Sequence, residues 1–111
     1  MNKVLIASIM FTTFLISGCS NQMYSWGGYN QKMLVYYKQH DSNKFIKSLE
    51  KIIKSGEKSN RVPPGIYGEL GYLYYEANKP DIAMEYFEKE KEAWPESTFI
   101  MDKMIRNSGN L

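Results

Sequence analysis

The chain has 111 residues, with 14 Lys and Arg against 12 Asp and Glu, and it contains one Cys and one His. Its length allows one small domain, and its near-neutral charge is not that of a nucleic-acid-binding protein. A single Cys excludes a disulfide framework, and one Cys with one His excludes a Cys/His zinc site built within one chain. We therefore expect no nucleic acid partner, no metal and no cofactor.

Residues 1–18 have the layout of a lipoprotein signal peptide. Lys3 precedes an apolar stretch over residues 4–16, which is a secretory pattern and is short for a transmembrane helix. The stretch ends in Ile16-Ser17-Gly18-Cys19, which resembles the bacterial lipobox. This resemblance implies cleavage before Cys19 and its lipidation by a diacylglycerol and a fatty acid such as palmitate. Several acyl chains would anchor the protein stably in a membrane. The alternative is a lone buried Cys after an ordinary signal peptide.

The residue after the lipidated Cys helps to sort lipoproteins in cells with two membranes, where Asp favours the inner membrane. Ser20, followed by Asn21, resembles the outer-membrane default. We therefore expect a lipid anchor in the cell outer membrane, with the chain facing the periplasm.

Residues 19–28 are expected to form the lipidated Cys and a short tether, and residues 29–111 the folded domain. The tether has no charged residue and includes two Gly. Tyr24, Trp26 and Tyr29 at its end make it unusually aromatic for a linker.

Hydrophobic periodicity and breaker residues predict an all-α domain of about five helices. The expected helices cover residues 30–39, 44–54, 66–77, 81–93 and 96–106, and a polar loop over 55–65 ends in Pro-Pro-Gly. In the first helix we expect Met33, Leu34 and Tyr37 on the inner face. In the second helix, Ile46, Leu49 and Ile53 form a one-sided stripe.

The third and fourth expected helices match the tetratricopeptide pattern, in which antiparallel helix pairs repeat along the chain. The match covers seven positions: Tyr67, Leu70, Gly71, Tyr74, Ala83, Phe87 and Pro95. Small residues at 71 and 83 would let the two helices approach closely, and Pro95 would end the pair. Glu90 departs from the pattern, which usually has Ala there, and the departure puts tight packing of that helix end in doubt.

The neighbouring helices fit the same architecture less closely. The last helix places Met101, Met104 and Ile105 one period after the first repeat positions, as a terminal cap. The first helix pair fits only at a longer period, with larger residues at the small positions. A plain helical bundle with a chance match is the alternative.

The segment Tyr24-Ser25-Trp26-Gly27-Gly28-Tyr29, close after a lipidated Cys, resembles a second known pattern. It is similar to a family of small bacterial lipoproteins of unknown function with a Tyr-x-Trp-Gly-x-Tyr segment and a tetratricopeptide-like body. Genes of that family often stand beside one for a curli-secretion-channel-like lipoprotein. The resemblance implies a role in a cell-envelope assembly or export system, with such a lipoprotein as a partner.

No arrangement of residues points to catalysis. His40 lies next to Asp41 in an expected turn, where an exposed position explains it better than general-base work. The glycines at 65–71 lack the Lys-Ser/Thr and the strand of a phosphate loop. We expect a protein that is not an enzyme.

Tyrosine is the unusual component, with nine in the chain. Tyr72, Tyr75 and Glu76 fall on the side of their helix that lines the concave groove of a tetratricopeptide array, and exposed tyrosines suit recognition. From the first helix pair we expect Val35, Lys38 and Gln39 to share this groove. The alternative is that the tyrosines only cover neighbouring helices.

Two functions follow as hypotheses. The first is an outer-membrane-anchored interaction module that binds another envelope protein through its concave face. The second is a glycan-binding or structural envelope lipoprotein, in which Tyr24, Trp26 and Tyr29 stack on sugar rings.

Overall fold

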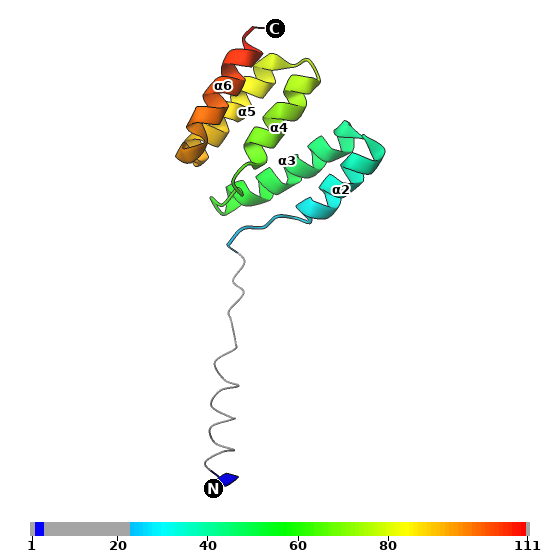
Figure 1. Cartoon of the computed structure of the whole chain (residues 1–111), viewed down its shortest axis with the longest axis vertical. Coiled ribbons are helices and arrows are strands. Elements are labelled where there is room, and N and C mark those ends of the chain that lie inside the picture. The colour runs from blue at the N-terminus through cyan, green and yellow to red at the C-terminus, as the bar shows by residue number, and fades with distance from the viewer. Residues whose placement is uncertain (1, 4–22, 111) are drawn as a thin grey trace.

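The computed structural model describes residues 2–3 and 23–110. The expected signal peptide, the lipidated Cys19 and the sorting residue Ser20 lie outside the described residues. The described part of the chain forms an all-α domain of five α-helices and one short 3-10 helix, without strands (Figure 1). The helices are α2 (Tyr29–Gln39), α3 (Ser42–Lys58), α4 (Ile66–Glu76), α5 (Pro80–Ala93), the 3-10 helix η2 (Pro95–Ser97) and α6 (Thr98–Ser108).

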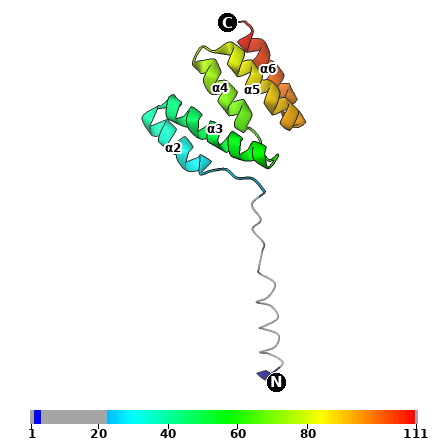
Figure 2. The same cartoon turned by 180° about the vertical axis from the view of Figure 1, so that it is seen from behind.

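The helices follow one another as antiparallel pairs, and each packs against the next along the chain (Figures 1 and 2). Contacts also link the alternate helices α2, α4 and α6. The hydroxyl of Tyr29 in α2 donates to Glu69 in α4, and Met101 in α6 lies against Gly68 in α4. The tetratricopeptide-like arrangement of two pairs and a final helix is therefore confirmed.

The second pair packs as the pattern predicts. Ala83 and Phe87 are completely buried. A β-carbon on Gly71 would lie 2.7 Å from Cε1 of Phe87 and 3.1 Å from the carbonyl oxygen of Ala83. Gly71 is therefore a point of close contact between α4 and α5, and no larger residue fits there without movement.

The first pair begins with a well-defined turn. His40 closes α2 in a left-handed conformation with φ of 53°, and the side chain of Asp41 caps α3 by accepting from the backbone N–H of Lys44 at 3.1 Å. This cap starts α3 two residues earlier than expected. The helix also continues to Lys58, and Gly56 near its end lets the following loop cross it closely. A β-carbon on Gly56 would lie 2.8 Å from Cα of Val62.

The predicted inner face of the first helix is partly wrong. Leu34 and Tyr37 are 55% and 61% exposed. Met33 faces the core as predicted, and Tyr29 and Tyr36 take the places expected for Leu34 and Tyr37. The ring of Tyr36 stacks on buried Phe45 of α3 with centroids 4.9 Å apart, and this stack fixes the rotation of α2 about its axis.

The last helix is the terminal cap that the repeat predicts, although it starts later than residue 96. The chain after Pro95 first makes a 3-10 turn, in which the hydroxyl of Thr98 donates to the carbonyl of Pro95 at 2.6 Å. The side chains of Met101, Met104 and Ile105 in α6 are half-buried. The ammonium of Lys91 holds α6 to α5 through Asp102, at 2.7 Å.

Candidate interaction face

Hydrogen-bonded pairs of tyrosine and glutamate join the helices. Besides the pair of Tyr29 and Glu69, the hydroxyl of Tyr74 donates to Glu50 at 3.0 Å and that of Tyr67 donates to Glu57 at 3.0 Å. Both bonds tie α4 to α3. Burial and the bond to Glu50 raise the pKa of Tyr74 to about 12, and burial with the neighbouring carboxylate also raises the pKa values of Tyr67 and Tyr29. These tyrosines are therefore structural.

On the opposite side of α4, Tyr72 is exposed and Tyr75 is half-buried. Tyr72 is 43% exposed, and its hydroxyl donates to Glu76 one turn later at 2.8 Å. This hydrogen bond raises the pKa of the Tyr72 phenol. The rings of Tyr72 and Tyr75 stack with centroids 6.5 Å apart. The three predicted residues of α4 thus form one ordered group on the surface, with an aromatic platform and a carboxylate at its edge.

The predicted residues of α2 are less closely gathered. Lys38 and Gln39 are exposed in its last turn. Val35, 46% exposed, lines an apolar groove of about 240 Å³ between α2 and α3, to which no residue of α4 contributes. The stack of Tyr36 on Phe45 sets a different rotation of α2 from the one expected. As a result Leu34 and Tyr37, which the sequence had placed in the core, are exposed.

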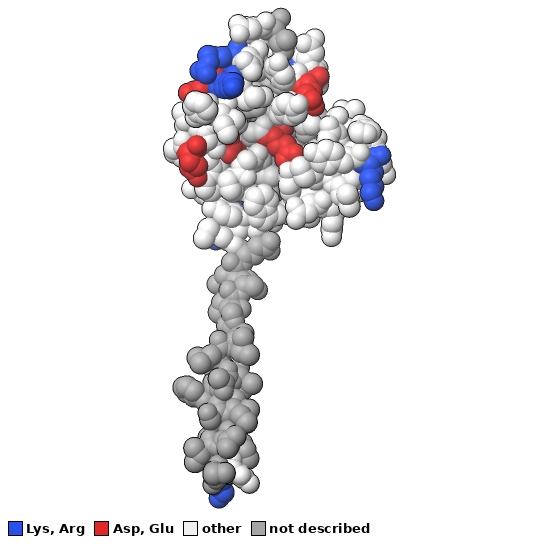
Figure 3. Space-filling view, viewed as in Figure 1, with Lys and Arg blue, Asp and Glu red and all other residues white. Residues whose placement is uncertain are grey.

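We define the aromatic face as Tyr72, Tyr75 and Glu76 of α4, which are joined by the stacked rings and the hydrogen bond to Glu76. Figure 3 shows mostly uncharged side chains on the side of the molecule seen in Figure 1, with separate small groups of charged ones. Apart from the carboxylate of Glu76 the face is uncharged, and tyrosines cost little side-chain entropy to bury and can bond through their hydroxyls. Such a face suits a protein partner.

The aromatic residues of the tether pack against the domain where the structure describes them. The ring of Tyr24 lies edge-on to that of Trp94, with ring centroids 5.7 Å apart. The rings of Trp26 and Tyr29 have centroids 6.0 Å apart. Gly27 has φ of 52° and lies so close to α3 that a β-carbon there would be 3.0 Å from Cγ1 of Ile52. Residues 23–28 are therefore attached to the domain rather than free.

A wide groove of about 930 Å³ opens beside this attached segment. It lies at the end of the domain where α3 and α5 finish, and Tyr24 and Trp94 line it together with polar residues. The polar residues are Glu57, Asn60, Arg61 and Glu92. The indole N–H of Trp94 is buried without a hydrogen-bond partner among the described residues.

The buried Glu90 has a structural role that the sequence did not predict. It is 1% exposed, and its carboxylate accepts from the backbone N–H of Gly65 at 2.7 Å and of Gly68 at 3.2 Å. An acid at this place caps the start of α4 from a neighbouring helix. The doubt about packing at this helix end was wrong, because the carboxylate replaces small-residue packing by hydrogen bonds.

The positions of the other sequence features give no sign of a functional site among the described residues. His40 is exposed at the end of α2. Within residues 2–3 and 23–110, no group of three His, Cys, Asp or Glu side chains is placed to hold a metal ion. Among the helices described, none combines the length and the apolar character needed to cross a membrane.

Comparison with known proteins gives one match. The family model described as "Domain of unknown function (DUF4810)" matches residues 23–104, well over half of the chain. Neither the curated proteins nor the solved structures provide a significant match.

Proposed function

Because the chain belongs to the DUF4810 family, whose description assigns no function, we propose a role from its own surfaces. The protein is a non-catalytic, lipid-anchored interaction module of the outer membrane. It faces the periplasm and binds another envelope protein through the aromatic face. Its cellular setting is an assembly or export system, with a secretion-channel-like lipoprotein as the candidate partner.

The observation that carries this proposal is the exposure of an ordered aromatic surface. Most tyrosines of α2 and α4 are used in the core or in helix contacts, as the bonds of Tyr29, Tyr67 and Tyr74 show. Tyr72 and Tyr75 are instead stacked on each other at the surface. Tetratricopeptide-like arrays bind partners on the face formed by the first helices of their pairs, here α2 and α4.

The anchor is supported by sequence. The only Cys of the chain stands at the end of an apolar segment, directly after Ser17-Gly18. The matched family region starts at residue 23, shortly after this Cys. A domain that begins four residues after a lipid anchor is held close to the membrane, where its partners would also be membrane-bound.

Site-specific photo-crosslinking in cells would test the proposal. A photoreactive phenylalanine analogue replaces Tyr72 in the full-length protein, and crosslinked partners are identified by mass spectrometry. We expect one defined envelope protein to be captured from Tyr72. Glu85, an exposed residue on the outer side of α5, is the matched control position. Equal capture of the same proteins from both positions would contradict the proposal.

The groove beside Tyr24 and Trp94 favours a second candidate function, which is glycan binding. Aromatic rings next to amide and charged groups are suited to sugar rings and their hydroxyls. Trp26 and Tyr29 of the original hypothesis are packed on the domain, so Trp94 takes their place beside Tyr24. Sedimentation of the purified lipoprotein with cell-wall sacculi, compared between the wild type and Trp94→Ala, tests this alternative.

A further inference from the structure

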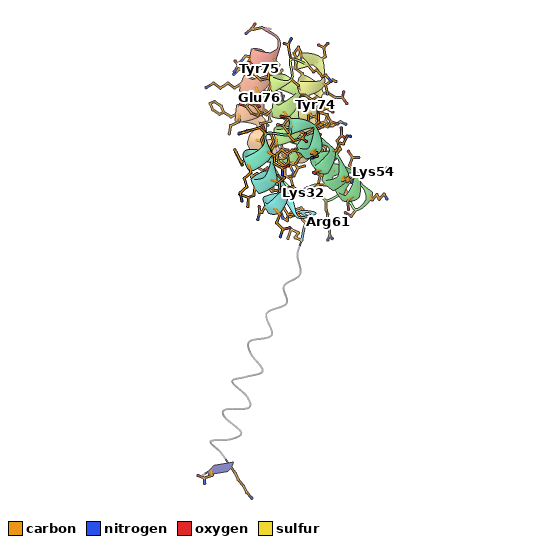
Figure 4. The ribbon with its side chains drawn as sticks, turned by 90° about the vertical axis from the view of Figure 1, so that its right-hand side faces the viewer. Lys32, Lys54, Arg61, Tyr74, Tyr75 and Glu76 are labelled. Atoms are coloured by element: carbon orange, nitrogen blue, oxygen red, sulfur yellow. The ribbon has the colours of Figure 1, made fainter. Side chains whose placement is uncertain are left out.

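The outer side of α3 carries a continuous row of lysines, which we call the lysine ridge. It consists of Lys44, Lys47, Lys51, Lys54 and Lys58, and all five are exposed. Their spacing of three and four residues places them along one side of the helix, over a length of about 21 Å at about 1.5 Å per residue. Figure 4 shows Lys54 on the side of α3 that faces away from α2, whereas Tyr75 and Glu76 lie on the α2 side.

The ridge has little neutralising charge of its own. Glu50 and Glu57, the two acids of α3, are turned toward α4 and accept hydrogen bonds from Tyr74 and Tyr67. Among the described residues, Lys44 alone of the ridge forms an ion pair, with Asp41 at 3.3 Å. On α5, by contrast, Lys89 and Lys91 are paired with glutamates of the same helix.

The two halves of the domain differ in charge. Residues 29–65 contain eight Lys and Arg against three Asp and Glu, whereas residues 66–111 contain five against nine. The chain is therefore close to neutral as a whole, but its first helix pair is strongly basic. An anionic surface would attract this pair and repel the second one.

The attached segment brings the basic pair close to the expected membrane. Met23 lines the same groove as Asn60 and Arg61, which belong to the loop that follows the end of α3. Four residue steps separate Met23 from Cys19, so the chain between them can span at most about 14 Å. If Cys19 carries the lipid, the end of α3 lies at the bilayer surface.

We propose that the lysine ridge and Arg61 rest on the anionic headgroups of phospholipids. This inference depends on the lipid anchor of the proposed function and adds a second contact to it. The acyl chains hold the protein in the membrane, and the ridge sets its orientation. Because the ridge and the aromatic face lie on different sides of the first helix pair, this orientation leaves the aromatic face free for a partner.

Amine labelling of the mature lipoprotein in vesicles tests the orientation. The full lipidated chain is reconstituted into vesicles of phosphatidylcholine alone, or of phosphatidylcholine with phosphatidylglycerol, and its lysines are acetylated and quantified by mass spectrometry. We expect labelling of Lys51, Lys54 and Lys58 to fall severalfold in the anionic vesicles. Lys38 and Lys103, exposed on α2 and α6, are internal controls and should change little.

Salt and substitution sharpen the test. Raising the salt from about 0.1 M to about 1 M shortens the screening length from about 10 Å to about 3 Å, so the protection should disappear. Replacing Lys47, Lys51 and Lys54 by Gln should restore labelling of Lys58, whereas Lys103→Gln should not.

Each outcome bears on a different part of the proposal. Equal labelling of the ridge in both kinds of vesicle, by a chain that floats with the vesicles, would overturn the ridge contact and leave the anchor intact. Protection of the ridge and of Lys38 and Lys103 alike would also overturn it, because it would indicate general burial. Failure of the chain to float with either kind of vesicle would overturn the anchor and the ridge contact together.

Discussion

Glu90 in α5 accepts a hydrogen bond from the backbone N–H of Gly68 in α4, with 3.2 Å between Oε2 and the nitrogen. Its other oxygen accepts from Gly65 at 2.7 Å. The N–H groups at a helix start have no partner within the helix, and Gly65 offers no side chain to cap them. A carboxylate from the next helix fills this role and so ties α5 to the start of α4.

The first prediction is that Glu90→Ala destabilises the protein, even though Ala is the usual residue of the repeat pattern at this position. The substitution leaves the N–H of Gly68 in α4 and that of its N-cap residue Gly65 without their acceptor, at a cost of about 1–3 kcal/mol in the free energy of unfolding. In a domain of this size that corresponds to a fall in Tm of at least about 4 °C. Thermal unfolding followed by circular dichroism measures it, with exposed Glu92→Ala as control. Equal Tm values for the two variants would show that the cap is not stabilising.

The second prediction concerns the contact between α4 and α5. Ala83 is completely buried, and a leucine there has no space, so Ala83→Leu should cost about 1–3 kcal/mol in the free energy of unfolding. Ala93→Leu places the same side chain at an exposed position near the end of the same helix and should do much less. Urea titration of both variants compares the two sites. A similar loss of stability at 83 and 93 would contradict the tetratricopeptide register.

This contact explains why the second helix pair could be predicted well. Small residues at 71 and 83, with an aromatic residue at 87, indicate two helices in close contact. Each residue has a specific size requirement, because Phe87 lies 2.7 Å from the place of a β-carbon on Gly71. A pattern with such strict steric meaning predicts both the helices and their packing.

The first pair shows where periodicity is insufficient. Met33, Leu34, Tyr36 and Tyr37 are all apolar or aromatic, so the sequence allows more than one inner face for α2. The stack of Tyr36 on Phe45 decides between them, and it joins residues on two different helices. A single sequence does not encode that choice in any local spacing.

The polar contacts between helices also could not be predicted from the sequence. Glu69 stands among many surface acids, and its spacing does not distinguish it, while the repeat pattern marks Glu90 only as a departure and not as a cap. Their roles arise only when the fold brings Gly68 or Tyr29 to them. The surface group of Tyr72, Tyr75 and Glu76 was predictable, because those residues lie on one side of a single helix opposite its apolar stripe.

The third prediction concerns pH. Burial raises the pKa of Glu69 above its ordinary value, against the bond from Tyr29, which lowers it. The folded state therefore favours the protonated acid, and the stability that protonation contributes is present below the ordinary pKa of 4.5 and lost as the pH rises through the raised value. Glu69→Gln keeps an acceptor for Tyr29 without the charge. We expect it to be more stable than the wild type at pH 7 and to lose this advantage near pH 4.

Urea unfolding of both proteins over this pH range measures the difference. Glu76→Gln, at an exposed site on the same helix, is the control and should show no such change with pH. A Glu69→Gln protein that is less stable than the wild type at pH 7 would mean that the ionised carboxylate stabilises the contact between α2 and α4.

The fourth prediction concerns the anchor. Cys19→Ser removes the sulfur that would take the diacylglycerol. Because lipidation is expected to precede cleavage, the variant should incorporate no palmitate and should accumulate as a larger, uncleaved precursor. Metabolic labelling with palmitate and gel electrophoresis measure both effects. Labelling of Cys19→Ser at the wild-type level would exclude this residue as the lipid site.

The fifth prediction concerns sorting, and it depends on the fourth. If Cys19 carries the lipid, Ser20 becomes the second residue of the mature chain, where Asp favours retention in the inner membrane. Ser20→Asp should therefore move the protein toward the inner-membrane fractions of a sucrose gradient in a Gram-negative host. Ser20→Thr keeps an uncharged hydroxyl and is the matched control. Position 20 precedes the first helix of the domain, which begins at Tyr29, and equal Tm values of the two variants would exclude misfolding as the cause of a shift. An unchanged distribution of Ser20→Asp would mean that another feature of the chain selects its membrane.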